Sequence, residues 1–221
     1  MIGAVIFDMD GVIIDSEPLW AEAQKEIFTD LGVEYSEELA TKTVGIGTYD
    51  TIDFWYRQKQ WQGVSFQEVE ERILSRMQVL IREKGNMMNG LKEMLDYFRS
   101  KGLKIALASG SPLSIINQVV DQLKIREYFE IIHSIDFEEY GKPHPAIFLS
   151  VSRKFEVEPL KCLVIEDSFN GLIAAKAARM KTVAYLPNGE FNNTRFDFAD
   201  LKLKSFPEFN DTYFNYLQNL I

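Results

Sequence analysis

The sequence is poor in the residues that form disulfides and bind soft metals. Its 221 residues include one cysteine and two histidines. One cysteine excludes an internal disulfide, and so few cysteines and histidines almost exclude a zinc site built from them. Cys162 lies in the apolar run KCLVIE, which favours a buried structural thiol. Any metal is therefore expected to be a hard cation bound by oxygen.

The sequence also lacks long apolar runs and positive net charge. No run approaches the roughly 20 residues of a membrane span, and the first residues have neither the basic flank nor the cleavage site of a signal peptide. The net charge of -9 disfavours nucleic acid and anionic membranes as partners. We expect a cytoplasmic, monomeric protein whose partner is a small metabolite.

The composition is that of a folded α/β protein. The apolar fraction of 46% and the charged fraction of 26% are typical of globular domains. Short apolar runs alternate with segments of helical periodicity, and this pattern predicts a parallel sheet flanked by helices. The expected strands are residues 4–7, 103–108, 131–135, 162–166 and 182–186.

The segment between the first two expected strands is too long for a simple crossover. Its apolar residues recur with helical periodicity. One helix is expected to be capped by Ser16 and to stop at Gly32, and another to begin after Ser65 and to end at Gly85. Several helices are therefore inserted after the first strand.

We expect two domains. Residues 16–86 form an inserted helical domain, and residues 1–15 together with 87–221 form the core. The hinges are expected near residues 14–17 and 84–90. Asp15 stands at the first hinge, where it is expected to stabilise the hinge or the helix start.

Polar side chains follow four of the expected strands. The carboxyl ends of parallel strands form the edge where ligands bind. Four carboxylates without histidine or cysteine match Mg²⁺, which is usually held by carboxylates, phosphate oxygens and water. A single acidic pair would indicate a solvated turn, but two pairs that both follow apolar strands favour a site. The residues are Asp8, Asp10, Ser109, Gly110, Ser111, Lys142, Glu166 and Asp167.

The same residues can bind and transfer a phosphoryl group. Ser109 and the following amide of Gly110 can bind phosphate oxygens beside a helix that begins near Pro112, although a plain helix cap is the alternative for this segment alone. Lys142 can neutralise the phosphate and a nucleophile.

Asp8 and Asp10 are two residues apart, so both face one substrate while Met9 faces away. Like charges raise one of the two pKa values. A bound metal and Lys142 would keep Asp8 anionic and nucleophilic, while Asp10 would protonate the leaving alcohol and later deprotonate water. Gly11 lets the chain turn beside the ligand.

The segments DMDGVIIDSE, ASGS, GKPHP and EDSFNG resemble, in order and spacing, the four motifs of the haloacid dehalogenase superfamily. The resemblance implies a Rossmann-like α/β core with an inserted α-helical cap. It also implies roles for the motif residues: Asp8 is the nucleophile, Asp10 the acid/base whose main-chain carbonyl meets Mg²⁺, Ser109 and Lys142 bind phosphate, and Glu166 and Asp167 complete the metal site.

Within this superfamily, DSEPLW, DFWYRQKQW and KPHP resemble the β-phosphoglucomutase-like group, and more narrowly bacterial sugar phosphatases such as 2-deoxyglucose-6-phosphatase and the hexitol phosphatases. Mutases of this group carry a cap arginine and a histidine after the first motif. Here VGIGTYD contains no arginine, and Trp20 occupies the histidine position. We therefore expect a sugar or polyol phosphatase; the alternatives are a β-phosphoglucomutase-type isomerase and a silent phosphate-binding module.

Residues of the cap that face the site are expected to select the substrate. For the aromatic ones, packing in the core of the cap is at least as good an interpretation. His144 and Asn170 flank the motifs and are candidates to orient them. The cap candidates are Glu17, Trp20, Gly45, Ile46, Gly47, Trp55 and Tyr56.

Overall fold

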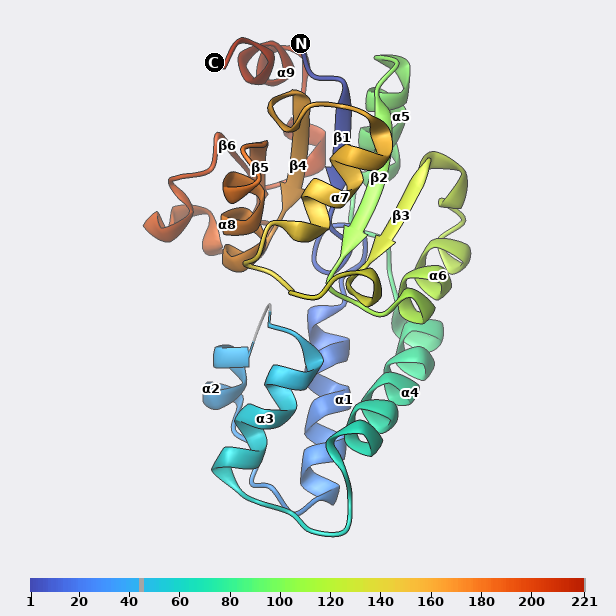
Figure 1. Ribbon diagram of the computed structural model, residues 1–221, viewed down its shortest axis with the longest axis vertical. Coiled ribbons are helices and arrows are strands. Elements are labelled where there is room, and N and C mark those ends of the chain that lie inside the picture. The colour runs from blue at the N-terminus through green and yellow to red at the C-terminus, as the bar shows by residue number, and fades with distance from the viewer. Residues whose placement is uncertain (44–45, 221) are drawn as a thin grey trace.

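A six-stranded parallel sheet forms the centre of the computed structural model, which describes residues 1–43 and 46–220 (Figure 1). The strand order is β3-β2-β1-β4-β5-β6. The predicted α/β fold is confirmed, and the five expected strands agree with those observed to within one residue at each end. The sixth strand was not predicted, because three residues are too few to show a period. The strands are β1 (Ala4–Phe7), β2 (Lys104–Ser109), β3 (Ile131–Ser134), β4 (Cys162–Glu166), β5 (Lys181–Tyr185) and β6 (Leu201–Leu203).

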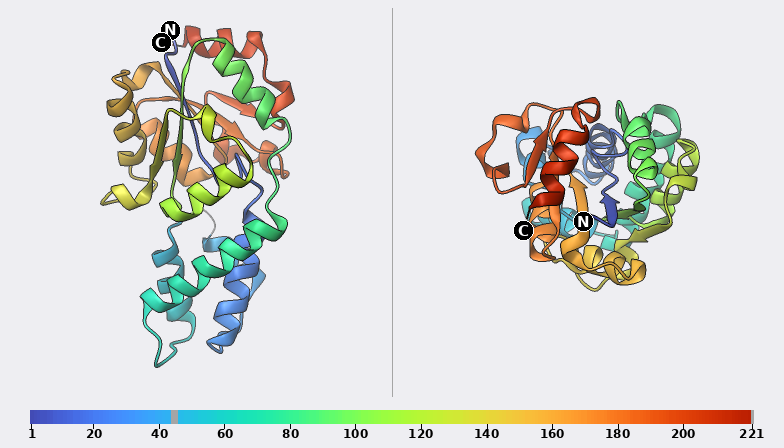
Figure 2. Two further views of the ribbon diagram at one scale, coloured as in Figure 1. Left: turned by 90° about the vertical axis from the view of Figure 1, so that its right-hand side faces the viewer. Right: turned by 90° about the horizontal axis from the view of Figure 1, so that it is seen from above.

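Helices cover both faces of the sheet (Figure 2). Successive strand residues point to opposite faces, so Ala4 and Ile6 contact one helical layer while Val5 and Phe7 contact the other. The first layer contains α7 and α8, and the second contains α5 and α6 with α9 beside α5. Burial on both faces explains why the strands are continuous apolar runs. These helices are α5 (Leu91–Ser100), α6 (Leu113–Gln122), α7 (Ala146–Phe155), α8 (Phe169–Ala177) and α9 (Asp211–Asn219).

The helical insertion, residues 17–84, lies between β1 and α5 in the sequence and beyond the carboxyl ends of the strands in space (Figure 1). Aromatic rings form its core: the Trp55 ring is stacked 4.8 Å from Tyr35 and lies 5.5 Å from Phe28, centroid to centroid. The division into domains at residues 15/16 and 86/87 stays a prediction. The helices are α1 (Glu17–Asp30), α2 (Glu37–Ala40), α3 (Thr48–Gln58) and α4 (Phe66–Lys84).

The two predicted serine caps differ in what their hydroxyls do. The Ser65 hydroxyl accepts from the Glu68 amide, and the Glu68 carboxylate accepts from the Ser65 amide. α4 therefore begins with a capping box. Ser16 stands directly before α1 as expected, but its side chain makes no capping hydrogen bond. Its hydroxyl is used elsewhere, as described below.

Two short chain segments and one helix pair connect the insertion to the core. Ile14 and Met87 form an isolated antiparallel bridge. The Met88 amide donates to the Ile13 carbonyl at 2.9 Å, and the Asp15 amide to the Asn86 carbonyl at 3.1 Å. The two connecting segments therefore run side by side where hinges were predicted.

A second connection joins α6 of the core to α4 of the insertion. The side-chain amides of Gln118 and Gln122 donate to the main-chain carbonyls of Gln78 and Ile81, each at 2.6 Å. These two glutamines are four residues apart and share one face of α6.

The single thiol lies in the core of the sheet. Cys162 is buried in β4, as its apolar neighbours predict, and burial raises its pKa to about 11. Across the part of the chain that the structure describes, no helix is both long and apolar enough to cross a bilayer.

Candidate active site

The carboxyl ends of the strands place one buried ammonium group between two carboxylates. Asp8 follows β1, Glu166 ends β4, and Lys142 reaches both from the segment between β3 and α7. Lys142 Nζ lies 2.6 Å from Asp8 Oδ1 and 2.6 Å from Glu166 Oε2. The Lys142 side chain is only 9% exposed. Charges here are screened by little water and interact strongly.

With its carboxylates ionised, this cluster carries a net negative charge. Burial, with the carboxylates of Glu166 and Asp10, raises the pKa of Asp8 to about 8, although the Lys142 ammonium acts in the opposite direction. Burial and the carboxylates of Glu166 and Asp8 also raise the pKa of Asp167. Burial disfavours the ammonium of Lys142, but Asp8 and Glu166 outweigh this effect and raise its pKa. One lysine does not neutralise three neighbouring carboxylates.

The three carboxylates fit a hard divalent cation. Asp8, Glu166 and Asp167 offer oxygen atoms that all lie within 4.8 Å of one another. An oxygen-only donor set with uncompensated negative charge suits Mg²⁺. The Asp10 carboxylate is not in this group, and its expected ligand atom is the main-chain carbonyl.

Gly11 makes room for one of these carboxylates. Its φ is +73°, and a Cβ atom at this position would lie 1.9 Å from Asp167 Oδ2. We predict that Gly11→Ala lowers both the stability of the protein and its affinity for Mg²⁺, because the methyl group displaces Asp167. Thermal unfolding with and without Mg²⁺ measures both effects.

Gly102→Ala is the matched control. Gly102 also has a positive φ, +69°, but a Cβ there meets nothing within 4 Å. It should therefore cost only the backbone strain, about 1–2 kcal/mol. Equal losses of stability and Mg²⁺ affinity in the two variants would contradict the steric explanation.

Asp10 follows Asp8 by two residues but has different surroundings. Its carboxylate accepts hydrogen bonds from Ser16 Oγ at 2.6 Å, Trp20 Nε1 at 2.9 Å and Ser111 Oγ at 2.7 Å. A longer contact of 3.3 Å comes from Ser109 Oγ. Met9, between the two aspartates, is fully buried in the core, as the alternation predicts. The two carboxylates therefore differ in their donors, which are hydroxyls and an indole for Asp10 and an ammonium for Asp8.

The segment after β2 supplies a candidate phosphate-binding loop. Ser109 is fully buried, and its hydroxyl accepts from the Ser111 amide at 3.0 Å. Gly110 and Ser111 line the cleft just before α6. The N terminus of a helix favours anions, so the position of this loop before α6 suits an anionic ligand.

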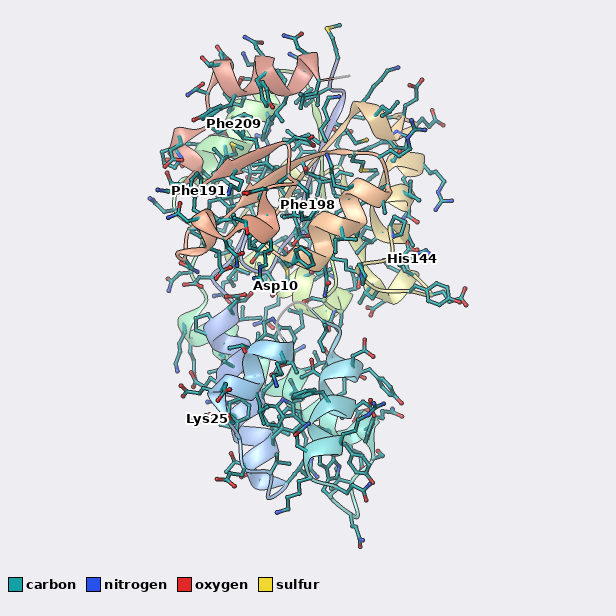
Figure 3. All side chains as sticks on the ribbon, turned by 90° about the vertical axis from the view of Figure 1, so that its left-hand side faces the viewer. Asp10, Lys25, His144, Phe191, Phe198 and Phe209 are labelled. Atoms are coloured by element: carbon teal, nitrogen blue, oxygen red, sulfur yellow. The ribbon has the colours of Figure 1, made fainter. Side chains whose placement is uncertain are left out.

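A cleft of about 750 Å³ lies between the strand ends and the insertion. Figure 3 shows Asp10 at the junction of the two and Lys25 on the insertion. The core contributes Asp8, Asp10, Gly110, Lys142 and Asp167, and the insertion contributes Glu17, Trp20, Lys25, Ile46 and Gly47, among others. Gly45 lies outside the described residues.

Other candidates lie away from the cleft. Trp55 is fully buried in the core of the insertion, and the Tyr56 ring packs 4.8 Å from that of Trp61, so the packing interpretation holds for both. His144 Nδ1 accepts from the Ala146 amide at 3.3 Å, at the start of α7. Asn170 is half-buried in α8, and Asp15 is exposed at the hinge.

Comparison with known proteins identifies the family. A profile of the haloacid dehalogenase-like hydrolases matches residues 2–179. The chain belongs to this family. This hydrolase is 40% identical over 207 residues to hexitol phosphatase B of Escherichia coli (strain K12), covering 93% of each chain. It is 31% identical over 180 residues to the phosphorylated carbohydrates phosphatase of Thermotoga maritima, covering 81% of this chain and 83% of the relative.

Solved structures agree with this assignment of the hydrolase. The β-phosphoglucomutase of Clostridium difficile superposes with a TM-score of 0.87 at 27% identity, covering 99% of this chain and 98% of that one. CbbY from Rhodobacter sphaeroides in complex with phosphate superposes with a TM-score of 0.85 at 26% identity, covering 94% and 96%. The resemblance inferred from the four motifs is confirmed, and the family and its relatives support a phosphatase.

Proposed function

We propose that this protein is a Mg²⁺-dependent phosphatase that hydrolyses small sugar or polyol phosphates through an aspartyl-phosphate on Asp8. The observation that carries the proposal is the pairing of buried Asp8 with Lys142 beside a metal-type carboxylate cluster, at the floor of a substrate-sized cleft. The names of the hexitol and phosphorylated-carbohydrate phosphatases support the substrate class. In this proposal residues 1–15 and 87–221 perform the chemistry, and residues 16–86 select the substrate.

Two displacements at phosphorus complete the reaction. In the first, a carboxylate oxygen of Asp8 forms a bond to phosphorus while the bond to the sugar oxygen breaks, and Asp10 gives that oxygen a proton. In the second, water attacks phosphorus, Asp10 takes a proton from it, and the bond to Asp8 breaks. Inorganic phosphate leaves, and Asp8 and Asp10 return to their starting states.

The other site residues bind the phosphoryl group and its charge. Ser109, Gly110 and the start of α6 supply a hydroxyl, amides and a favourable helix end, and Lys142 supplies a positive charge. Asp8, Glu166 and Asp167, with the main-chain carbonyl of Asp10, would hold Mg²⁺. When bound, Mg²⁺ neutralises charge on the transferring phosphoryl group.

Mg²⁺ is expected to stabilise the folded protein as well as to support catalysis. A ligand at a hundredfold excess over its dissociation constant adds about 2.7 kcal/mol, which raises the Tm of a protein of this size by about 5–10 °C. Thermal unfolding in EDTA and in millimolar Mg²⁺ measures the shift. Asp167→Asn should lose it, and a wild-type Tm that does not respond to Mg²⁺ would contradict the metal site.

A phosphosugar mutase is the second candidate, since a β-phosphoglucomutase is among the similar structures. A mutase must also hold the far phosphate of a bisphosphorylated intermediate, for which an arginine fork is suited. In the described part of the cleft, the cationic lining residues are Lys25 and Lys142. The Lys25 side chain is 58% exposed and lies 3.6 Å from Glu37. This arrangement favours the phosphatase.

Product analysis distinguishes these functions. The protein is incubated with Mg²⁺ and a panel of hexitol and hexose phosphates, including β-glucose 1-phosphate with a bisphosphate primer. We expect free phosphate; conversion of β-glucose 1-phosphate to glucose 6-phosphate would instead establish the mutase. If neither the panel nor p-nitrophenyl phosphate is hydrolysed in a Mg²⁺-dependent way, the protein is a phosphate-binding module.

A further inference from the structure

The carboxylate of Asp10 is held from two parts of the molecule. Ser16 and Trp20, which donate to Oδ1, belong to the start of α1 in the insertion. Ser109, which ends β2, and Ser111, which follows it, belong to the core and donate to Oδ2. The position of each carboxylate oxygen is therefore set by hydrogen bonds from a different part of the fold.

Trp20 differs chemically from the three serines. A hydroxyl rotates and can donate or accept, whereas an indole N–H only donates, along a direction that the ring fixes. The Trp20 ring is half-buried, packs against the hydrophobic core and lines the cleft. Its N–H therefore ties the direction of Oδ1 to the position of α1.

A carboxylate has about four lone-pair sites, and four protein donors contact Asp10 here. One donor must be released before Asp10 reaches a substrate oxygen. The Ser109 contact is the longest at 3.3 Å, and the Ser109 hydroxyl also accepts from the Ser111 amide. Trp20 holds the opposite oxygen, so it can keep its bond while Oδ2 changes partner.

We propose that Trp20 is a positioning residue: its indole N–H orients Asp10 from the insertion and makes proton transfer to the leaving group depend on where α1 lies. This role rests on the proposed function, in which Asp10 is the general acid. Trp20 would then act on the general acid in addition to lining the cleft.

The test compares two substrates with different need for the acid. The alkoxide of a hexitol phosphate needs a proton to leave, whereas the p-nitrophenolate of p-nitrophenyl phosphate leaves with little help. Trp20→Phe keeps an aromatic ring and removes the N–H. We expect kcat/KM for the hexitol phosphate to fall about tenfold, the scale of one hydrogen bond to a charged group, with little change for p-nitrophenyl phosphate. The change should lie in kcat rather than in KM.

Trp55→Phe is the matched control. Trp55 is a buried indole of the same insertion, and its Nε1 has no hydrogen-bond partner among the described residues. This control should affect the two substrates equally. A similar substrate-dependent loss in Trp55→Phe, or an equal loss for both substrates in Trp20→Phe, would overturn the role of Trp20 alone.

A double-mutant cycle with Asp10→Asn gives an independent answer. If Trp20 acts through Asp10, Trp20→Phe should cause no further substrate-dependent loss in the Asp10→Asn background. An additive loss would show that Trp20 acts by another route. Wild-type protein that hydrolyses neither substrate would overturn the proposed function, and the role of Trp20 with it.

Discussion

Asp8→Asn is expected to abolish turnover, with kcat at least about 10⁴-fold lower, the scale on which enzymes respond to loss of their nucleophile. A carboxamide does not attack phosphorus, so the loss should be equally severe for hexitol phosphates and for p-nitrophenyl phosphate. Phosphate release measures it, and mass spectrometry of the acid-quenched protein should detect a phosphoenzyme in the wild type only. Near-normal turnover in the variant would contradict the mechanism.

The same variant should not be less stable than the wild type in the absence of Mg²⁺. The pKa of Asp8 rises from 3.8 to about 8 on folding. Between these values the folded state binds more protons than the unfolded state, so this group lowers stability as the pH rises through that window. Asp8→Asn removes the titration. Its Tm in EDTA should equal or exceed that of the wild type at pH 8 and should vary less between pH 4 and 8; a markedly lower Tm would contradict this account.

Lys142→Met is expected to have the opposite effect on stability. It leaves Asp8 and Glu166 buried, 2.6 Å from where their shared ammonium was. Removing the ammonium costs about 3–5 kcal/mol, because Glu166 stays buried without compensation. Asp8→Asn differs in this respect because it leaves Lys142 paired with Glu166. Urea unfolding of the metal-free protein measures the loss, and hydrolysis should fall as well.

Lys25→Met is the matched control, since Lys25 lines the same cleft but its side chain is 58% exposed. An exposed ion pair contributes about 0–1 kcal/mol, so this variant should unfold almost as the wild type does. The double variant Asp8→Asn/Lys142→Met should recover part of the loss caused by Lys142→Met. Additive effects of the two substitutions would contradict a shared cluster.

The sequence predicted the core of the site because parallel topology turns distant residues into neighbours. Asp8 and Glu166 lie far apart in the chain, but β1 and β4 are adjacent parallel strands, so their carboxyl ends must meet. Lys142 was assigned by motif, and the structure places its ammonium group between these carboxylates. Burial of β1 and β4 on both faces gave the apolar runs by which the strands were recognised.

What the sequence did not predict depends on the direction in which single side chains point. Ser16 has the residue type and position of a helix cap, yet its hydroxyl reaches Asp10. Trp20 and Trp55 were equivalent as aromatic residues of the insertion, and only the packing of α1 and α3 directs one towards the cleft and the other into the core. Local sequence fixes neither rotation, because both result from long-range packing.

The paired connecting segments place one wall of the cleft directly beside the junction of insertion and core. Glu17 and Trp20 follow the first connecting segment directly, whereas Ile46 and Gly47 come further along the chain, just before α3. A substrate would meet one wall that contacts Asp10 and another that does not, so changes at Trp20 should alter chemistry and changes at Ile46 and Gly47 should alter the size of the substrates accepted.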